Sequence, residues 1–263
     1  MIRILSDLHL HDGRTRVREL RQLEPLLPGV QTLVLNGDTC EMRAGTTAAQ
    51  LAEVKAFFRE RVPKTIFITG NHDPDISDTH ELLTAAGRVW ITHGDACFDE
   101  FTPWSRYLPL IRRLIAMKRA ADPALDLAQL QTRFRIAREV ARETIVPDRT
   151  QRSWQAHAAW LWTTFFPPRQ PLAMLRAWRD LPRLAARLAA ENHPTSRVVV
   201  LGHVHLPGVW FIPGGRVVIN TGSFFRPLGG NLVDVLPDRV RVRRILSRRG
   251  EFIAGKLLRE IPL

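Results

Sequence analysis

Cysteine is scarce in this chain: among 263 residues, only Cys40 and Cys97 are cysteines. Two thiols are too few for the disulfide framework of a small secreted protein or for the thiolate cluster of a structural zinc site. We therefore interpret both as small packed side chains in a reduced compartment. The chain also lacks any apolar run of the roughly 20 residues that a membrane-spanning helix needs. This absence argues against an integral membrane protein.

We expect no removable targeting segment at the N-terminus. A strand-like apolar run begins at Ile2 and leads directly into a polar motif that contains Asp7. Cleavage of a leader at this place would remove part of that motif. We therefore expect a cytoplasmic protein.

Acidic residues are outnumbered, with 26 Asp and Glu against 38 Lys and Arg and a net charge of +12. The excess is uneven along the chain. Residues 1–95 carry 11 basic and 13 acidic residues, residues 96–197 carry 17 and 9, and residues 198–263 carry 10 and 4. The last two segments should therefore produce the positive field of the protein, which favours anionic partners.

Five short apolar runs rich in β-branched residues predict strands. They are residues 2–5, 32–35, 65–68, 89–91 and 198–201. Each run is followed by a polar motif: Ser6-Asp7-Leu8-His9, Gly37-Asp38, Gly70-Asn71-His72-Asp73, Thr92-His93-Gly94-Asp95 and Gly202-His203-Val204-His205. Because loops at the carboxyl ends of strands line the ligand crevice of layered α/β sheets, we expect the five motifs to meet.

The polar residues of these motifs suit a pair of divalent cations. Two cations ~3.5–4 Å apart can generate a nucleophile at neutral pH and polarise phosphoryl oxygens. Oxygen and imidazole ligands suit manganese first, with iron and zinc as alternatives. The candidate ligands are Asp7, His9, Asp38, Asn71, His93, His203 and His205. His203 and His205 are two residues apart, so in extended backbone both would project to one side. His72 then remains for proton transfer.

The ordered series of motifs resembles the calcineurin-like metallophosphoesterase superfamily over residues 1–95 and 197–245. The resemblance implies an α/β fold, a layered β-sandwich flanked by helices. It also implies that Asp38 bridges two metals. The expected ligands of one metal are Asp7, His9, Asp38 and His205, and those of the other are Asp38, Asn71, His93 and His203. His72, steadied by Asp73, would contact the scissile phosphate and assist the leaving group.

Residues 96–196 form a long insertion, so we expect a core of residues 1–95 and 197–263 with a helical cap. Helical spacing of apolar residues from Tyr107 to Ile115 predicts one amphipathic helix, and the stretches 154–166 and 172–190 predict two more. The candidate substrate-binding residues of the insertion are Arg106, Arg112, Arg113, Arg176, Arg179, Arg183 and Arg187. The last four are spaced to line one helix face.

Three interpretations of the insertion remain open. It could be a helical cap with its own small core and solvated arginines. It could receive an acylated phosphate substrate near an anionic membrane surface, where aromatic and basic side chains suit the interface. It could also bind nucleic acid through its basic and aromatic residues.

A closer resemblance favours the second interpretation. Gly37-Asp38-Thr39-Cys40-Glu41, residues 93–99 and the arginine-rich helix from Arg106 look like the UDP-2,3-diacylglucosamine pyrophosphatase branch of the superfamily. This resemblance implies hydrolysis of the diphosphate of a lipid A precursor by a peripheral protein at the inner face of the cytoplasmic membrane. The chain departs from that branch at His72, where arginine is common.

Two alternative functions remain. Another enzyme of the superfamily, acting on a cyclic nucleotide, a nucleotide, a phosphoprotein or a nucleic acid, would share the same ligands. A non-catalytic scaffold could also use this fold.

Overall fold

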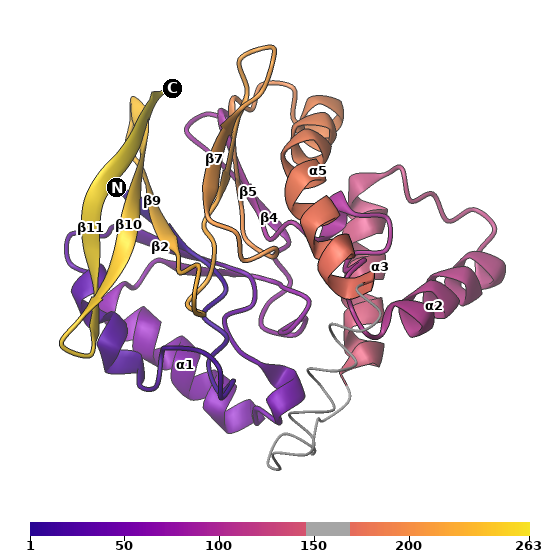
Figure 1. Ribbon diagram of the computed structural model, residues 1–263, viewed down its shortest axis with the longest axis horizontal. Coiled ribbons are helices and arrows are strands. Elements are labelled where there is room, and N and C mark those ends of the chain that lie inside the picture. The colour runs from indigo at the N-terminus through magenta and orange to yellow at the C-terminus, as the bar shows by residue number, and fades with distance from the viewer. Residues whose placement is uncertain (146–168) are drawn as a thin grey trace.

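In the computed structural model, which describes residues 1–145 and 169–263, two mixed β-sheets pack face to face between layers of helix (Figure 1). The first sheet contains, in spatial order, β11 (Glu251–Pro262), β10 (Arg239–Arg248), β9 (Asn231–Val235), β1 (Ile2–Leu5), β2 (Thr32–Asn36) and β3 (Thr65–Ile68). The second contains β4 (Glu81–Thr84), β5 (Val89–Thr92), β6 (Val198–Leu201), β8 (Val217–Asn220) and β7 (Gly208–Phe211). The predicted layered α/β sandwich is confirmed.

Alternation of side chains along the strands builds the layers. In β6, Val198 and Val200 face the interior shared by the two sheets, whereas Val199 and Leu201 pack on the outer side of their sheet. All four are fully buried, as expected for a strand covered on both faces. The prediction of a strand from the continuous apolar run at residues 198–201 is therefore confirmed.

Helices cover both outer faces. The α1 helix (Ala48–Arg61) and the 3-10 helix η1 (Leu20–Leu26) bury apolar residues against the first sheet. The α5 helix (Arg169–Asn192) lies along the second sheet (Figure 1), and its Leu181 and Ala185 are fully buried in the same cluster as Trp90 of β5. Two further short 3-10 helices, η2 (Met42–Ala44) and η3 (Asp95–Cys97), follow site motifs.

The predicted insertion is helical where it is described. The α2 helix (Leu108–Ala121) and the α3 helix (Leu130–Thr144) pack through a cluster that includes Ile111, Leu114 and Val140. The apolar face predicted from Tyr107 onward is therefore the α2–α3 contact. The predicted aromatic helix of residues 154–166 lies outside the described residues. Because α5 packs against the second sheet, part of the insertion contacts the core directly.

Among the described residues, no helix combines the length and the apolar character required to cross a lipid bilayer.

Parallel pairing places the motif loops together. Strands β1, β2 and β3 are mutually parallel neighbours in one sheet, and β5 and β6 are parallel neighbours in the other. Their carboxyl ends consequently lie at the same edge of the sandwich. The five loops that follow these strands carry the candidate ligands.

Candidate metal centre

The candidate ligands sit on unusual backbone. Five of them have left-handed φ values: Asp7 (51°), His9 (47°), Asp38 (49°), His203 (72°) and His205 (57°). Residues other than glycine seldom adopt left-handed backbone angles, and such backbone strain is concentrated at functional sites. The expectation of extended backbone between His203 and His205 is wrong. The turns nevertheless direct both imidazoles toward the same centre.

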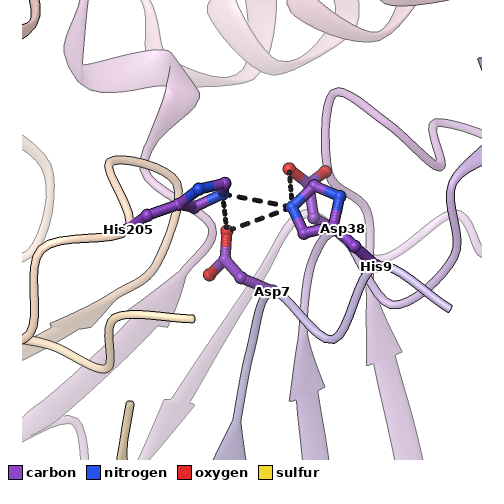
Figure 2. Close-up of side chains that lie close together, drawn as sticks. All are labelled: Asp7, His9, Asp38 and His205. Carbon is purple, nitrogen blue, oxygen red and sulfur yellow. Dashed lines mark hydrogen bonds and ion pairs between the residues drawn. The ribbon is translucent and has the colours of Figure 1, made fainter. Parts of the chain in front are cut away.

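One group of ligand atoms converges around Asp7 (Figure 2). Potential ligand atoms of Asp7, His9, Asp38 and His205 all lie within 4.8 Å of one another. His205 Nε2 is 3.2 Å from Asp7 Oδ1, and His9 Nε2 is 3.7 Å from Asp38 Oδ2. The two imidazole nitrogens, His9 Nε2 and His205 Nε2, are 3.1 Å apart. These four residues are the ones expected to hold one metal.

A second group shares Asp38. Ligand atoms of Asp38, His93 and His203 also lie within 4.8 Å of one another. His93 Nε2 is 3.3 Å from Asp38 Oδ2 and 3.3 Å from Asn71 Oδ1, so Asn71 adjoins this group. The structure therefore brings all seven candidate ligands together, in the two sets expected for a bridged pair of metals.

Outer contacts orient three of the histidines. His93 Nδ1 donates to the carbonyl of Asn36 at 3.1 Å, and His203 Nε2 donates to the carbonyl of Phe101 at 2.8 Å. His9 Nδ1 lies 3.4 Å from Glu41 Oε2. Metal-ligating histidines almost always donate their other ring nitrogen to a carbonyl or carboxylate, which leaves the inner nitrogen with a lone pair. All three rings follow this arrangement.

The donor set fits divalent metals. His203 Nδ1 is buried and has no hydrogen-bond partner among the described residues, although an orphaned buried nitrogen is costly. His203 belongs to the cluster that contains Asp38, and a cation held there would offer this nitrogen a partner. The two cysteines are also buried, and burial first of all raises the pKa of the Cys97 thiol to about 12. Neutral thiols at this position are packed side chains, as expected.

Electrostatics within the centre are dominated by Asp38. Burial opposes ionisation of Asp38, but the positive charges of His93, His72 and His9 outweigh this effect and hold its pKa well below the ordinary value. Burial likewise disfavours a charged His93, and Asp38 reverses the effect, so the pKa of His93 lies well above its usual range. Burial, followed by the charge of His93, lowers the pKa of His203 to about 3. His203 is therefore neutral and ready to bind a cation, whereas a cation at this site would have to displace the proton of His93.

Asp73 holds the Asp38 loop and does not contact His72 through its carboxylate. Its two oxygens accept hydrogen bonds from the backbone amides of Asp38, Thr39, Cys40 and Gly70 at 2.7–3.1 Å. The prediction that Asp73 steadies His72 is therefore wrong. The fully buried carboxylate shapes the turn that presents the bridging residue.

Glu41 is the partner of His72. Its Oε2 accepts from His72 Nδ1 at 2.5 Å, and the same oxygen is near His9. On the other side of the ring, Arg43 places a guanidinium nitrogen 3.3 Å from His72 Nε2. In the sequence, Glu41 stands out only as part of the segment Gly37–Glu41 that carries the family resemblance. Its position three residues after Asp38 is the signal that could have marked it.

Glycine is required where loops cross the ligands. A Cβ at Gly70 would lie 2.1 Å from Asp38 Oδ1 and 2.3 Å from the Asp38 amide nitrogen. A Cβ at Gly202 would lie 2.2 Å from Asp7 Oδ2. Real Cβ atoms do not approach heavy atoms this closely, so any larger residue would displace a ligand carboxylate.

The centre opens into a cavity of about 900 Å³. His9, His72 and His205 form part of its wall. The remainder includes four arginines that the sequence analysis did not select: Arg14, Arg16, Arg18 and Arg226. The signal for the first three was the alternation of arginine through residues 14–18, in the segment of lowest net charge, whereas nothing in the sequence marks Arg226.

The predicted arginines of the insertion lie elsewhere. None of the seven lines the cavity at the metal centre. Arg106, Arg112 and Arg176 line a separate cavity of about 670 Å³, and Arg187 lines a third of about 420 Å³. Arg113, Arg179 and Arg183 are exposed, as is Arg187. The four arginines of α5 do share an exposed face, where Arg179 pairs with Asp180 and Arg187 with Glu191.

Solved structures with low sequence identity resemble this chain over nearly its whole length. One, from Streptococcus pneumoniae TIGR4, is described as an uncharacterized protein and predicted phosphoesterase; it is 15% identical, with 100% of this chain and 97% of that chain covered and a TM-score of 0.42. A dimetal phosphatase from Danio rerio is 14% identical, with 96% and 97% covered and a TM-score of 0.47. Vps29 from Entamoeba histolytica, complexed with zinc, is 12% identical, with 99% and 98% covered and a TM-score of 0.41.

A search of curated protein sequences gives no significant match. The family model described as calcineurin-like phosphoesterase, however, matches residues 1–207. That match spans most of the chain and includes every candidate ligand. It confirms the predicted superfamily and the prediction of a metal-dependent phosphoester hydrolase. The chain belongs to the calcineurin-like phosphoesterase family.

Proposed function

We propose that this protein hydrolyses phosphoric esters or diphosphates at a dinuclear metal centre. The observation that carries the proposal is the Asp38 carboxylate, which is shared by two converging sets of ligand atoms. Asp7, His9, Asp38 and His205 would hold one cation. Asp38, Asn71, His93 and His203 would hold the other. When bound, the two cations would supply a nucleophile at neutral pH and charge for the phosphoryl oxygens.

His72 would serve the leaving oxygen. It lines the cavity, its Nε2 lies 4.0 Å from the bridging carboxylate, and Glu41 fixes the ring from the opposite nitrogen. Burial, first of all, lowers the pKa of His72 despite the opposing charges of Asp38 and Glu41. A proton carried on Nε2 would therefore be given up readily to the departing group. Arg43 beside Nε2 adds positive charge that would attract the phosphoryl oxygens.

A finer substrate assignment follows from the sequence resemblance. We propose UDP-2,3-diacylglucosamine as the first candidate substrate, with manganese as the first candidate metal. The separate cavity near His203 supports this choice because it joins the aromatic rings of Phe98 and Trp104 to the cationic side chains of Arg106, Arg112 and Arg176. Such a lining suits a substrate with an apolar part and a phosphate part. An anionic membrane surface and, as a lesser candidate, nucleic acid complete the proposed partners.

Hydrolysis assays test the proposal at two levels. Turnover of 4-nitrophenyl phosphate or bis(4-nitrophenyl) phosphate that requires added Mn²⁺ and disappears with a chelator is expected. Absence of turnover with manganese, iron and zinc would favour a non-catalytic scaffold.

A second panel addresses the substrate. UDP-2,3-diacylglucosamine, in detergent, should be hydrolysed more efficiently than UDP-N-acetylglucosamine, cyclic AMP, a phosphopeptide or single-stranded DNA. Preference for one of the latter compounds would move the protein to another substrate class without changing the metal centre.

A further inference from the structure

The cavity at the metal centre has one strongly cationic wall. Arg14, Arg16, Arg18 and Arg226 line it, and the described lining residues include no aspartate or glutamate. Three of these arginines come from the loop after β1, and the fourth comes from the segment after β8. The backbone amide of Arg16 donates to the carbonyl of Phe224 at 3.1 Å, which ties the two segments together.

The four arginines differ in how their charges are compensated. Arg14 forms a bidentate ion pair with Asp12. Within the described part of the chain, neither Arg16 nor Arg226 forms an ion pair with a carboxylate. The Arg16 guanidinium is half-buried and lies 5.6 Å from the centre of the Phe252 ring. Two like charges are thus held on one wall without an acidic partner.

Arg16 and Arg226 are close enough to repel each other. Burial, followed by the positive charge of Arg226, lowers the pKa of Arg16. Like charges brought together cost free energy unless an anion neutralises them. Guanidinium groups bind phosphate oxygens through paired, charge-assisted hydrogen bonds. A phosphate-class dianion between Arg16 and Arg226 would remove the repulsion.

The cationic wall is continuous with the catalytic centre. The Phe225 ring lies 4.7 Å from the His9 ring and 5.1 Å from the His205 ring, and the Arg14 guanidinium lies 5.7 Å from the Phe225 ring centre. Phe225 therefore connects the metal-ligand imidazoles to the arginines along one surface. A single substrate molecule can reach both.

We propose that this wall is a second anion subsite, in which Arg16 and Arg226 bind a phosphate-class group that the substrate carries in addition to its scissile phosphate. The subsite rests on the proposed function, because the scissile phosphate is placed at the metal centre. It makes the preferred substrate a molecule with two anionic phosphate-type groups. A neutral or singly phosphorylated molecule would use only half of the cavity.

Binding measurements with hydrolysis-resistant compounds test the subsite. Alkane bisphosphonates with three to six carbons are compared with alkylphosphonates of the same length by isothermal titration calorimetry on the manganese-loaded protein. At the best length, the bisphosphonate should bind about tenfold more tightly, which corresponds to about 1.4 kcal/mol. Since the gain is electrostatic, it should shrink as the salt concentration rises.

Substitutions locate the effect. The double variant Arg16→Gln/Arg226→Gln should lose most of the bisphosphonate advantage, and the exposed single change Arg226→Gln should lose part of it without a packing cost. The matched control Lys256→Gln/Arg259→Gln removes the same charge from exposed positions on β11 and should keep the full advantage. Equal affinity of the paired compounds for the parent, or an advantage that survives in the double variant, would overturn the proposal.

The stoichiometry distinguishes a substrate group from a free anion. One bisphosphonate per chain is expected, and saturation by two separate alkylphosphonates per chain with no bisphosphonate advantage would identify a site for free phosphate instead. The calorimetric result does not depend on turnover. Tighter bisphosphonate binding without metal-dependent hydrolysis would support the subsite and contradict the proposed function. Metal-dependent hydrolysis without tighter bisphosphonate binding would support the proposed function and contradict the subsite.

Discussion

The loops of the metal centre and the helices of the insertion both carry many charged residues, but they treat those charges differently. At the centre, Asp7 and Asp38 are almost fully buried, and each accepts a hydrogen bond from a backbone amide of another motif. On α5, the arginines are exposed and their partners are close neighbours on the same helix, such as Glu191 for Arg187. Buried charge requires a specific structure around it, whereas exposed charge requires almost none.

The contrast explains which residues sequence reasoning could find. A carboxylate is costly to bury without compensating charge or hydrogen bonds. The motif residues were therefore informative as an ordered set, although no single motif was. An exposed arginine costs little and can occur anywhere. The arginines of the insertion that contact the core prove to lie on α3, where Arg138 and Arg142 pair with Asp78 and Asp75 just beyond the Asn71-His72-Asp73 motif.

The largest expected effect tests the buried charges of the metal centre. Asp38→Ala should remove both metals and reduce turnover to background, because its carboxylate belongs to both ligand sets. Elemental analysis of the purified protein and a 4-nitrophenyl phosphate assay measure the two effects. Asp180→Ala, which removes a half-buried carboxylate from α5, should retain both metals. Two metals per chain and normal turnover in Asp38→Ala would exclude a bridging role.

A steric change should be nearly as damaging. Gly70→Ala places a Cβ 2.1 Å from Asp38 Oδ1, so the bridging carboxylate must move. We expect a loss of about 10²-fold or more in rate, since displacements of about 1 Å can cost that much. Gly13→Ala is the control, because no heavy atom lies within 4 Å of its added Cβ. Similar kinetics for the two variants would show that the loop absorbs the methyl group.

Loss of His72 should separate proton transfer from metal binding. His72→Ala should keep its metals and lose about 10²–10⁴-fold in rate, the usual range for a positioned acid or base. Substrates with good leaving groups should be affected less. Glu41→Gln should cause a smaller loss of the same kind by weakening the support of the ring. An equal loss for leaving groups of very different pKa would assign His72 to phosphate binding.

The pH dependence of stability offers a more moderate effect. Burial lowers the pKa of His203 to about 3 in the folded protein, compared with an ordinary value of 6.5, so the unfolded chain binds the extra proton between these values. The contribution of neutral His203 is therefore complete above about pH 6.5 and falls as the pH is lowered toward 3. In chelator-treated protein, the difference in unfolding free energy between the parent and His203→Gln, from urea titrations, should shrink from pH 7 to pH 4. A constant difference would contradict this origin.

The smallest expected effect tests the exposed arginines of α5. The double change Arg176→Glu/Arg183→Glu should leave hydrolysis of 4-nitrophenyl phosphate within about twofold, since neither residue lines the cavity of the metal centre and surface charges contribute little to stability. If α5 faces an anionic membrane, binding to phosphatidylglycerol vesicles should weaken by ~1 kcal/mol per residue near the surface. Vesicle sedimentation at two salt concentrations measures this. Unchanged vesicle binding would show that the arginine face of α5 is only solvated and does not contact a membrane.

Five strands and the order of the ligand motifs could be predicted from the sequence, whereas β4 and β7 to β11 were not predicted. The runs at residues 2–5, 65–68 and 198–201 match β1, β3 and β6 residue for residue, because short runs rich in apolar residues suit strands that are covered on both faces. The motif residues were identifiable because their chemical types are rarely assembled for any other purpose. Their assignment as ligands remains a proposal that the metal analyses above will test.

The contacts that the neighbours of the ligands make could not be predicted before the chain was folded. Asp73 follows His72 in the chain, yet its carboxylate contacts four backbone amides, and Glu41 reaches His72 from another loop. Sequence adjacency does not specify side-chain contact when the backbone turns sharply. Three of the four arginines of the cationic cavity wall likewise come from residues 1–95, which carry more acidic than basic residues. The local field depends on which charges fold toward the cavity and which pair elsewhere, and no count along the chain contains that information.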